Sequence, residues 1–176
     1  MRQSFISFVV LLSVLATGMS SCKKSKDHYV PYISFSAFLR GPQFSNDSIV
    51  GCKDTVTFKL DSVTNKYVAD TIAVGDTVLF LVGYGSRGND LVSARLSADT
   101  TALRFIYTVS DEVMDVLKAE SKPEEGLLYF NAGYNFVIIP TVYIARKSGS
   151  YDMVFTVTSD SDYSPVSLTV VQPVSE

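Results

Sequence analysis

Residues 83–88 read G-Y-G-S-R-G and match the glycine spacing of dinucleotide-binding turns. Such a turn needs a helix to begin at its end, so that the helix dipole and its free amides meet a pyrophosphate. Here Asn89 and Asp90 follow, and then a run of alternating residues that indicates another strand. The sequence therefore argues against a nucleotide cofactor. It favours a flexible hairpin whose glycines allow positive φ.

The same loop carries side chains that could hold a sugar or a protein partner. An aromatic ring can stack on the apolar face of a sugar, and fork-like polar groups can bind its hydroxyls. We therefore take this loop as the candidate ligand-binding site, formed by Tyr84, Arg87, Asn89 and Asp90.

Carboxylates are the other groups with potential chemistry. Acidic residues gather between 111 and 125, where a glycosidase could find two carboxylates facing each other across a cleft. Acids at a helix start also serve the helix dipole and solubility. Asp160 and Asp162 have a spacing that can begin a calcium loop, but the rest of an EF-type loop does not follow. The sequence thus assigns no catalytic residue, no metal ligand and no cofactor.

The two cysteines lie in different surroundings. Arg2 is followed by an apolar stretch over 5–15, and small residues then lead to Cys22, with Lys23 after it. This three-part layout is typical of an export signal. Its apolar part is about half of the ~20 residues that a membrane-spanning helix needs. If Cys22 is modified, Cys52 is left without a partner for a disulfide or a zinc site.

Cys22 and the serines before it resemble the lipobox of bacterial lipoproteins, although Met19 stands where leucine is usual. The basic segment after it resembles the tethers of small envelope lipoproteins from Gram-negative gut anaerobes. The resemblance implies that residues 1–21 are removed as a signal peptide and that Cys22 is acylated. Residues 22–31 are then a tether and 32–176 a single domain. Because Lys23 replaces the aspartate of inner-membrane retention, we expect lipid anchoring in the outer membrane, on either its periplasmic or its surface face.

Composition supports one β-rich domain. The chain has 176 residues and 47% hydrophobic content, and its net charge of −3 is close to neutral. No basic patch in the sequence indicates binding of nucleic acid. Ten tyrosines and eleven phenylalanines with no tryptophan suit a sheet protein.

Alternating apolar residues predict a series of short strands separated by polar or glycine-bearing turns. One segment differs, because acids after Ser110 and apolar residues at helical spacing predict a short connecting helix over 111–120. The predicted apolar faces are Ile33, Phe35 and Ala37; Val56, Phe58 and Leu60; Val78, Phe80 and Val82; Val92, Ala94 and Leu96; Leu103, Phe105 and Tyr107; Met153, Phe155 and Val157; and Val166, Leu168 and Val170.

Residues 147–158 resemble the penultimate strand of an immunoglobulin-like or PKD-like domain. Gly149 precedes Tyr151 at the position of the tyrosine corner, and Met153 stands where antibody domains place a cysteine. The antibody-type tryptophan and disulfide are missing. The resemblance implies an all-β fold, an immunoglobulin-like antiparallel β-sandwich of the looser class.

Together these observations favour a non-catalytic, membrane-anchored envelope lipoprotein that binds a glycan or an envelope protein. One alternative is a carbohydrate-active hydrolase with a carboxylate pair across a cleft. A second is a structural subunit that donates or accepts a strand at a sheet edge.

Overall fold

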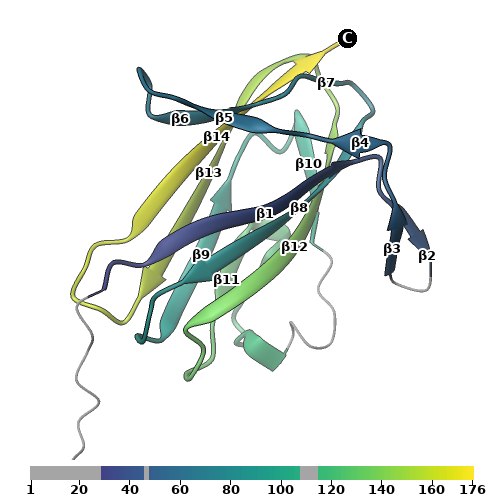
Figure 1. Ribbon diagram of the computed structural model, residues 1–176. Helices are drawn as coiled ribbons and strands as arrows, with labels where there is room; N and C mark the ends of the chain where they lie inside the picture. Colours follow the sequence, from purple (N-terminus) through teal and green to yellow (C-terminus); the bar gives the residue numbers. More distant parts are fainter. Residues whose placement is uncertain (1–28, 46–47, 108–114) are drawn as a thin grey trace, which may run out of the picture.

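The computed structural model describes residues 29–45, 48–107 and 115–176. Cys22, the leader and the first part of the expected helix lie outside these ranges. Within them, no helix is long and apolar enough to cross a membrane. The described chain folds into two packed sheets with a separate small hairpin (Figure 1).

The first sheet has five strands in the order β10-β12-β8-β1-β4, all antiparallel to their neighbours. Its strands are β1 (Tyr32–Arg40), β4 (Asp54–Thr55), β8 (Thr77–Gly85), β10 (Leu103–Tyr107) and β12 (Phe136–Ala145).

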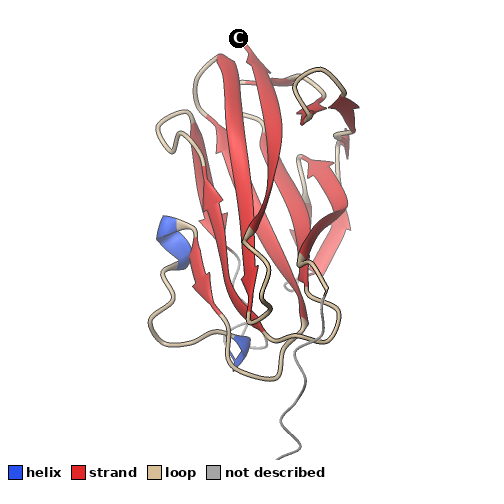
Figure 2. Ribbon diagram, turned by 90° about the vertical axis from the view of Figure 1, so that its left-hand side faces the viewer, coloured by secondary structure: helices blue, strands red, loops and turns tan. Residues whose placement is uncertain are grey.

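The second sheet has seven strands, in the order β11-β9-β13-β14-β6-β5, with β7 also beside β14. Both β6 and β7 run parallel to β14, whereas the other pairs are antiparallel. Figure 2 shows the long strands of the sandwich and the short helical turns at its side. The remaining elements are β5 (Phe58–Asp61), β6 (Lys66–Ala69), β7 (Ile72–Ala73), β9 (Leu91–Ser97), β11 (Leu127–Tyr129), β13 (Gly149–Ser159), β14 (Val166–Ser175), the β2 (Gln43–Ser45) and β3 (Ser48–Gly51) hairpin, and the 3-10 turn η1 (Pro123–Glu125).

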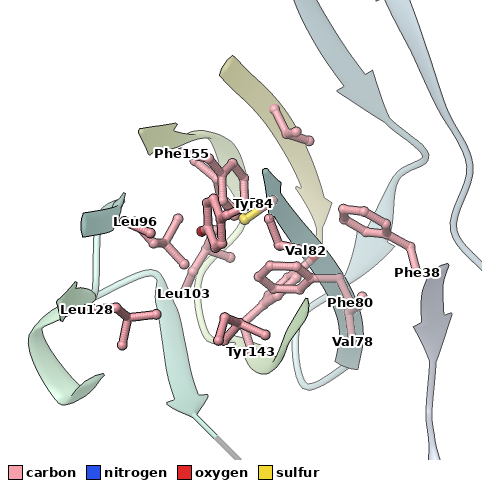
Figure 3. Close-up of a cluster of buried hydrophobic side chains, with 14 of the residues drawn as sticks. Phe38, Val78, Phe80, Val82, Tyr84, Leu96, Leu103, Leu128, Tyr143 and Phe155 are labelled. Atoms are coloured by element: carbon pink, nitrogen blue, oxygen red, sulfur yellow. The ribbon is translucent and has the colours of Figure 1, made fainter. Parts of the chain in front are cut away.

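The core fills the space between the sheets with side chains at alternate strand positions. Met153, Phe155 and Val157 on β13 are fully buried, as their spacing predicts. Phe155 makes edge contacts with Phe35 and Phe80, at ring-centroid distances of 5.1 and 5.7 Å. Figure 3 shows this cluster, to which both sheets contribute.

Two predicted core positions are wrong. Leu60 is 53% exposed, because β5 is the edge strand of its sheet and has a neighbouring strand on one side alone. Val92 is 38% exposed, because Ser159 pairs with Leu91 while Thr158 pairs with Ser93. Val92 is therefore the extra residue of a β-bulge, which reverses the direction of its side chain.

The helix expected over 111–120 ends earlier than predicted. Residues 111–114 lie outside the described ranges, and helical geometry is present at Asp115 and Val116. Leu117 already forms a β-bridge with Phe130. The Asn131 amide donates to the carbonyl oxygens of Asp115 and Leu117, at 3.0 and 3.2 Å. These bonds satisfy carbonyls at the end of the helix and let Leu117 turn into the core.

Tyr151 forms the tyrosine corner that the sequence predicts. Its hydroxyl donates to the carbonyl oxygen of Ser148 at 2.8 Å, three residues upstream. The turn passes through Gly149 at φ 145°, and Met153 is fully buried two residues beyond the tyrosine. The sandwich is therefore immunoglobulin-like in this corner as well as in its layers.

A buried polar pair joins the two sheets. Tyr143 of β12 donates its hydroxyl to Oε1 of Gln172 on β14 at 2.6 Å, and both residues are fully buried. Gln172 Nε2 donates to the carbonyl oxygens of Asp70 and Pro173. Burial raises the pKa of the Tyr143 phenol, so it remains a protonated donor.

Replacing Gln172 with leucine is expected to lower the free energy of unfolding by about 1–3 kcal/mol, because the Tyr143 hydroxyl loses its buried acceptor. Urea titration of the purified chain measures the loss. The double variant Gln172→Leu with Tyr143→Phe should be less destabilised than the sum of the single variants. If the losses in free energy of unfolding of the two single variants simply add up in the double variant, Tyr143 and Gln172 are not energetically coupled.

Candidate functional site

The loop at residues 86–90 crosses from one sheet to the other, because β8 and β9 belong to different sheets. The expected hairpin is therefore wrong. Ser86 is buried, whereas Arg87 at φ 38° and Gly88 at φ 108° form the turn. A glycine suits the second of these positions, since left-handed backbone costs it little.

The structure places the four candidate residues in different environments. Tyr84 and Asn89 are each 3% exposed, so a sugar has no access to the face of Tyr84. Asp90 is half-buried and accepts from the Gly133 amide at 3.0 Å. The amide of Asp90 donates to Oδ1 of Asp160, and the amide of Asp160 donates back to the Asp90 carbonyl. Asp90 thus connects three loops through hydrogen bonds. Of the four candidate residues, Arg87 is the exposed one.

Arg87 instead lies over Tyr32, one of two exposed aromatic rings on the outer face of the first sheet. Tyr32 of β1 and Phe136 of β12 both pair with Gly85 of β8, so they stand in one row across three strands. Their ring centroids are 6.4 Å apart with an interplanar angle of 22°. The Arg87 guanidinium carbon lies 6.0 Å from the centroid of the Tyr32 ring. We call Tyr32, Phe136 and Arg87 the aromatic platform.

Two strand glycines make room for these rings. A Cβ added to Gly85 would lie 2.3 Å from Cζ of Tyr32, and one added to Gly83 would lie 3.2 Å from Cε2 of Phe136. The rings therefore fold down over the glycine backbone, as expected where a strand glycine lets another group approach closely. Tyr32 and Phe136 remain 37% and 45% exposed, which is enough for contact with a ligand.

The platform combines a flat apolar surface with a fork of hydrogen-bond donors. Two nearly parallel rings can stack on the apolar face of a sugar, and the adjacent guanidinium can donate to hydroxyl or carboxylate oxygens. Ile138, 44% exposed, pairs with Gly83 one step farther along β12 and extends the apolar surface. The arrangement suits binding, and its residues supply no acid–base pair.

The sequence analysis singled out neither Tyr32 nor Phe136 as a functional residue. The useful signal was the Gly-x-Gly spacing of Gly83 and Gly85 inside a strand. Such glycines mark a strand over which neighbouring side chains lie. The identity of those neighbours depends on strand order, which the sequence does not state.

The other candidates for chemistry remain at the surface. Asp115, Glu120, Glu124 and Glu125 are exposed, while Asp111 and Glu112 lie outside the described residues. Cys52 is an exposed free cysteine. In the part of the chain that the structure describes, no group of three histidine, cysteine or carboxylate side chains is placed to hold a metal ion.

No family model matches the sequence, and no curated protein matches it either. Among solved structures, the chain is similar to the C-terminal domain of the AgI/II polypeptide BspA from Streptococcus agalactiae. The TM-score is 0.42 with 13% identity, over 81% of this chain and 50% of that one. Domains 4 and 5 of the S-layer protein SbsC give a TM-score of 0.32 with 13% identity, over 70% and 52%. The PapD-like domain 7 of human CEP192 gives 0.35 with 17% identity, over 77% and 99%.

The chain thus spans about half the length of the bacterial structures that it resembles. At these identities and TM-scores, we infer neither a family nor a function from the likeness.

Proposed function

We propose that this chain is a non-catalytic, lipid-anchored binding module of the outer membrane and that its ligand is a glycan. Acylation of Cys22 would hold it to the membrane, and the β-sandwich would present the aromatic platform. The observation that carries the proposal is the pair of exposed, nearly parallel rings of Tyr32 and Phe136, with Arg87 over the Tyr32 ring.

A glycan fits this surface better than a compact polar ligand does. The rings lie on a sheet face, so the site is shallow and suits an extended chain whose sugar rings stack one after another. The single guanidinium favours a sugar that offers a carboxylate or adjacent hydroxyls at one end.

The test is a glycan array probed with the full chain purified in detergent micelles. We expect Tyr32→Ala and Phe136→Ala to weaken binding of the selected glycans by roughly tenfold each, because an aromatic contact is worth about 0.5–1.5 kcal/mol beyond its buried area. Gly85→Ala should weaken binding as well, because its Cβ would displace the Tyr32 ring.

Tyr163→Ala is the matched control, since this tyrosine is 43% exposed in the β13–β14 loop. It should bind as the unchanged chain does. The proposal fails if no glycan binds, or if the platform variants and the control lose the same affinity.

A further inference from the structure

A cleft of about 550 Å³ separates the two sheets at the end where β1 begins. Pro31 and Ile33 lie on one side of it, Val166 and Leu168 on the other, and Leu60 closes one end with the β5–β6 turn. Ile33, Val166 and Leu168 are half-buried and pack against the core. The core of the sandwich is therefore partly open along this cleft.

An incompletely paired strand edge borders the cleft on each side. On the side of β1 away from β8, the paired strand is β4, which meets β1 at Leu39 and Arg40. On the side of β14 away from β13, pairing with β6 and β7 is confined to 170–171 and 174–175. Among the described residues, no strand pairs there with 32–35 or with 166–169. Figure 1 shows these starts of β1 and β14 at one end of the sandwich.

We propose that this cleft accepts an extended strand of a partner protein, which adds to the free edge of β1. Main-chain groups of an unpaired edge favour a strand as the occupant, since they can form a ladder that a globular surface cannot supply. The free edge of four residues spans about 13 Å, at roughly 3.3 Å per residue. The occupant is therefore a segment of about four to six residues.

The lining defines the side chains that the partner strand needs. Lys66 is the charged residue of the cleft, and its Nζ already lies 2.5 Å from Oδ2 of Asp152. Apolar residues at alternate positions would enter between Ile33, Val166 and Leu168, and polar residues would face solvent. An uncharged, alternating segment thus fits the cleft.

The probe is a phage-displayed library of nine-residue peptides, selected on the full chain in detergent micelles. We expect selected peptides to alternate apolar and polar residues. A synthetic peptide with a selected sequence should slow amide hydrogen exchange at residues 32–35 of the chain. The same peptide, N-methylated at the alternate amides that would face β1, should bind at least tenfold more weakly. It keeps its side chains but loses the N–H groups that would donate to β1.

Two substitutions in one hairpin provide matched variants. Leu60→Arg introduces a charge at the end of the cleft, at a position exposed enough to leave the fold intact, and should weaken the peptide at least tenfold. Val63→Arg lies outside the lining and is 90% exposed, so it should bind within twofold of the unchanged chain. Phe136→Ala should weaken glycan binding about tenfold and leave peptide binding unchanged, which separates this proposal from the proposed function.

Three results would overturn the proposal. The first is a selection that yields no peptide, and the second is equal binding by the N-methylated peptide. The third is slower amide hydrogen exchange at residues 32–35 as the concentration of the chain rises in the absence of peptide, together with dimers in analytical sedimentation. That result would make a second copy of this chain the occupant.

Discussion

Replacing Phe155 with alanine is expected to lower the free energy of unfolding by about 3–5 kcal/mol, which is the usual cost of removing a fully buried phenylalanine. Its ring is inaccessible to solvent and contacts Phe35 and Phe80, so the deletion leaves a cavity between strands of both sheets. Urea unfolding followed by circular dichroism measures the change.

Val92→Ala is the control for that experiment, because Val92 is the partly exposed residue of the β9 bulge. Its unfolding free energy should stay within about 0.5 kcal/mol of the unchanged chain. A loss below about 1 kcal/mol for Phe155→Ala would contradict the central position of this ring in the core.

Replacing Cys22 with serine is expected to abolish incorporation of labelled palmitate into the chain. A hydroxyl at this position cannot take the thioether-linked lipid that the lipobox resemblance implies. Each buried methylene contributes about 0.8 kcal/mol to membrane binding, so loss of the acyl chains removes the main anchoring energy. Metabolic labelling followed by purification of the chain measures the effect.

Cys52→Ser should keep full palmitate labelling, since Cys52 is a surface cysteine of the folded domain. Persistent label in the Cys22→Ser variant would contradict acylation at Cys22.

Local sequence patterns predicted the sandwich well. The alternating runs around Met153 and Leu103 are strands with those residues buried, because side-chain direction within a strand depends on local geometry alone. The tyrosine corner at Tyr151 is also local, since its hydroxyl bonds only three residues upstream.

The failures involve contacts that local patterns do not record. Val92 faces outward because β13 pairs with a bulge in β9, and Leu60 is half-exposed because its hairpin forms a sheet edge beside the open cleft. Tyr84 is the exception, because a local pattern does record it: β8 extends to Gly85, and Tyr84 continues the inward face of Phe80 and Val82. The platform forms because β1 and β12 both pair with β8, which brings Tyr32 and Phe136, far apart in sequence, to the same glycines.

The start of β1 contributes to both proposed binding surfaces, and it lies at the end of the sandwich opposite the C-terminus (Figure 1). With a lipid on Cys22, the tether over 22–31 would reach at most about 35 Å, at 3.3–3.6 Å per residue. Ligands attached to the same membrane would then meet the domain at a raised effective concentration, whereas freely diffusing ligands would not. Weak affinity in solution would be sufficient for stable capture at the bilayer, so the anchor would select for partners that share its membrane.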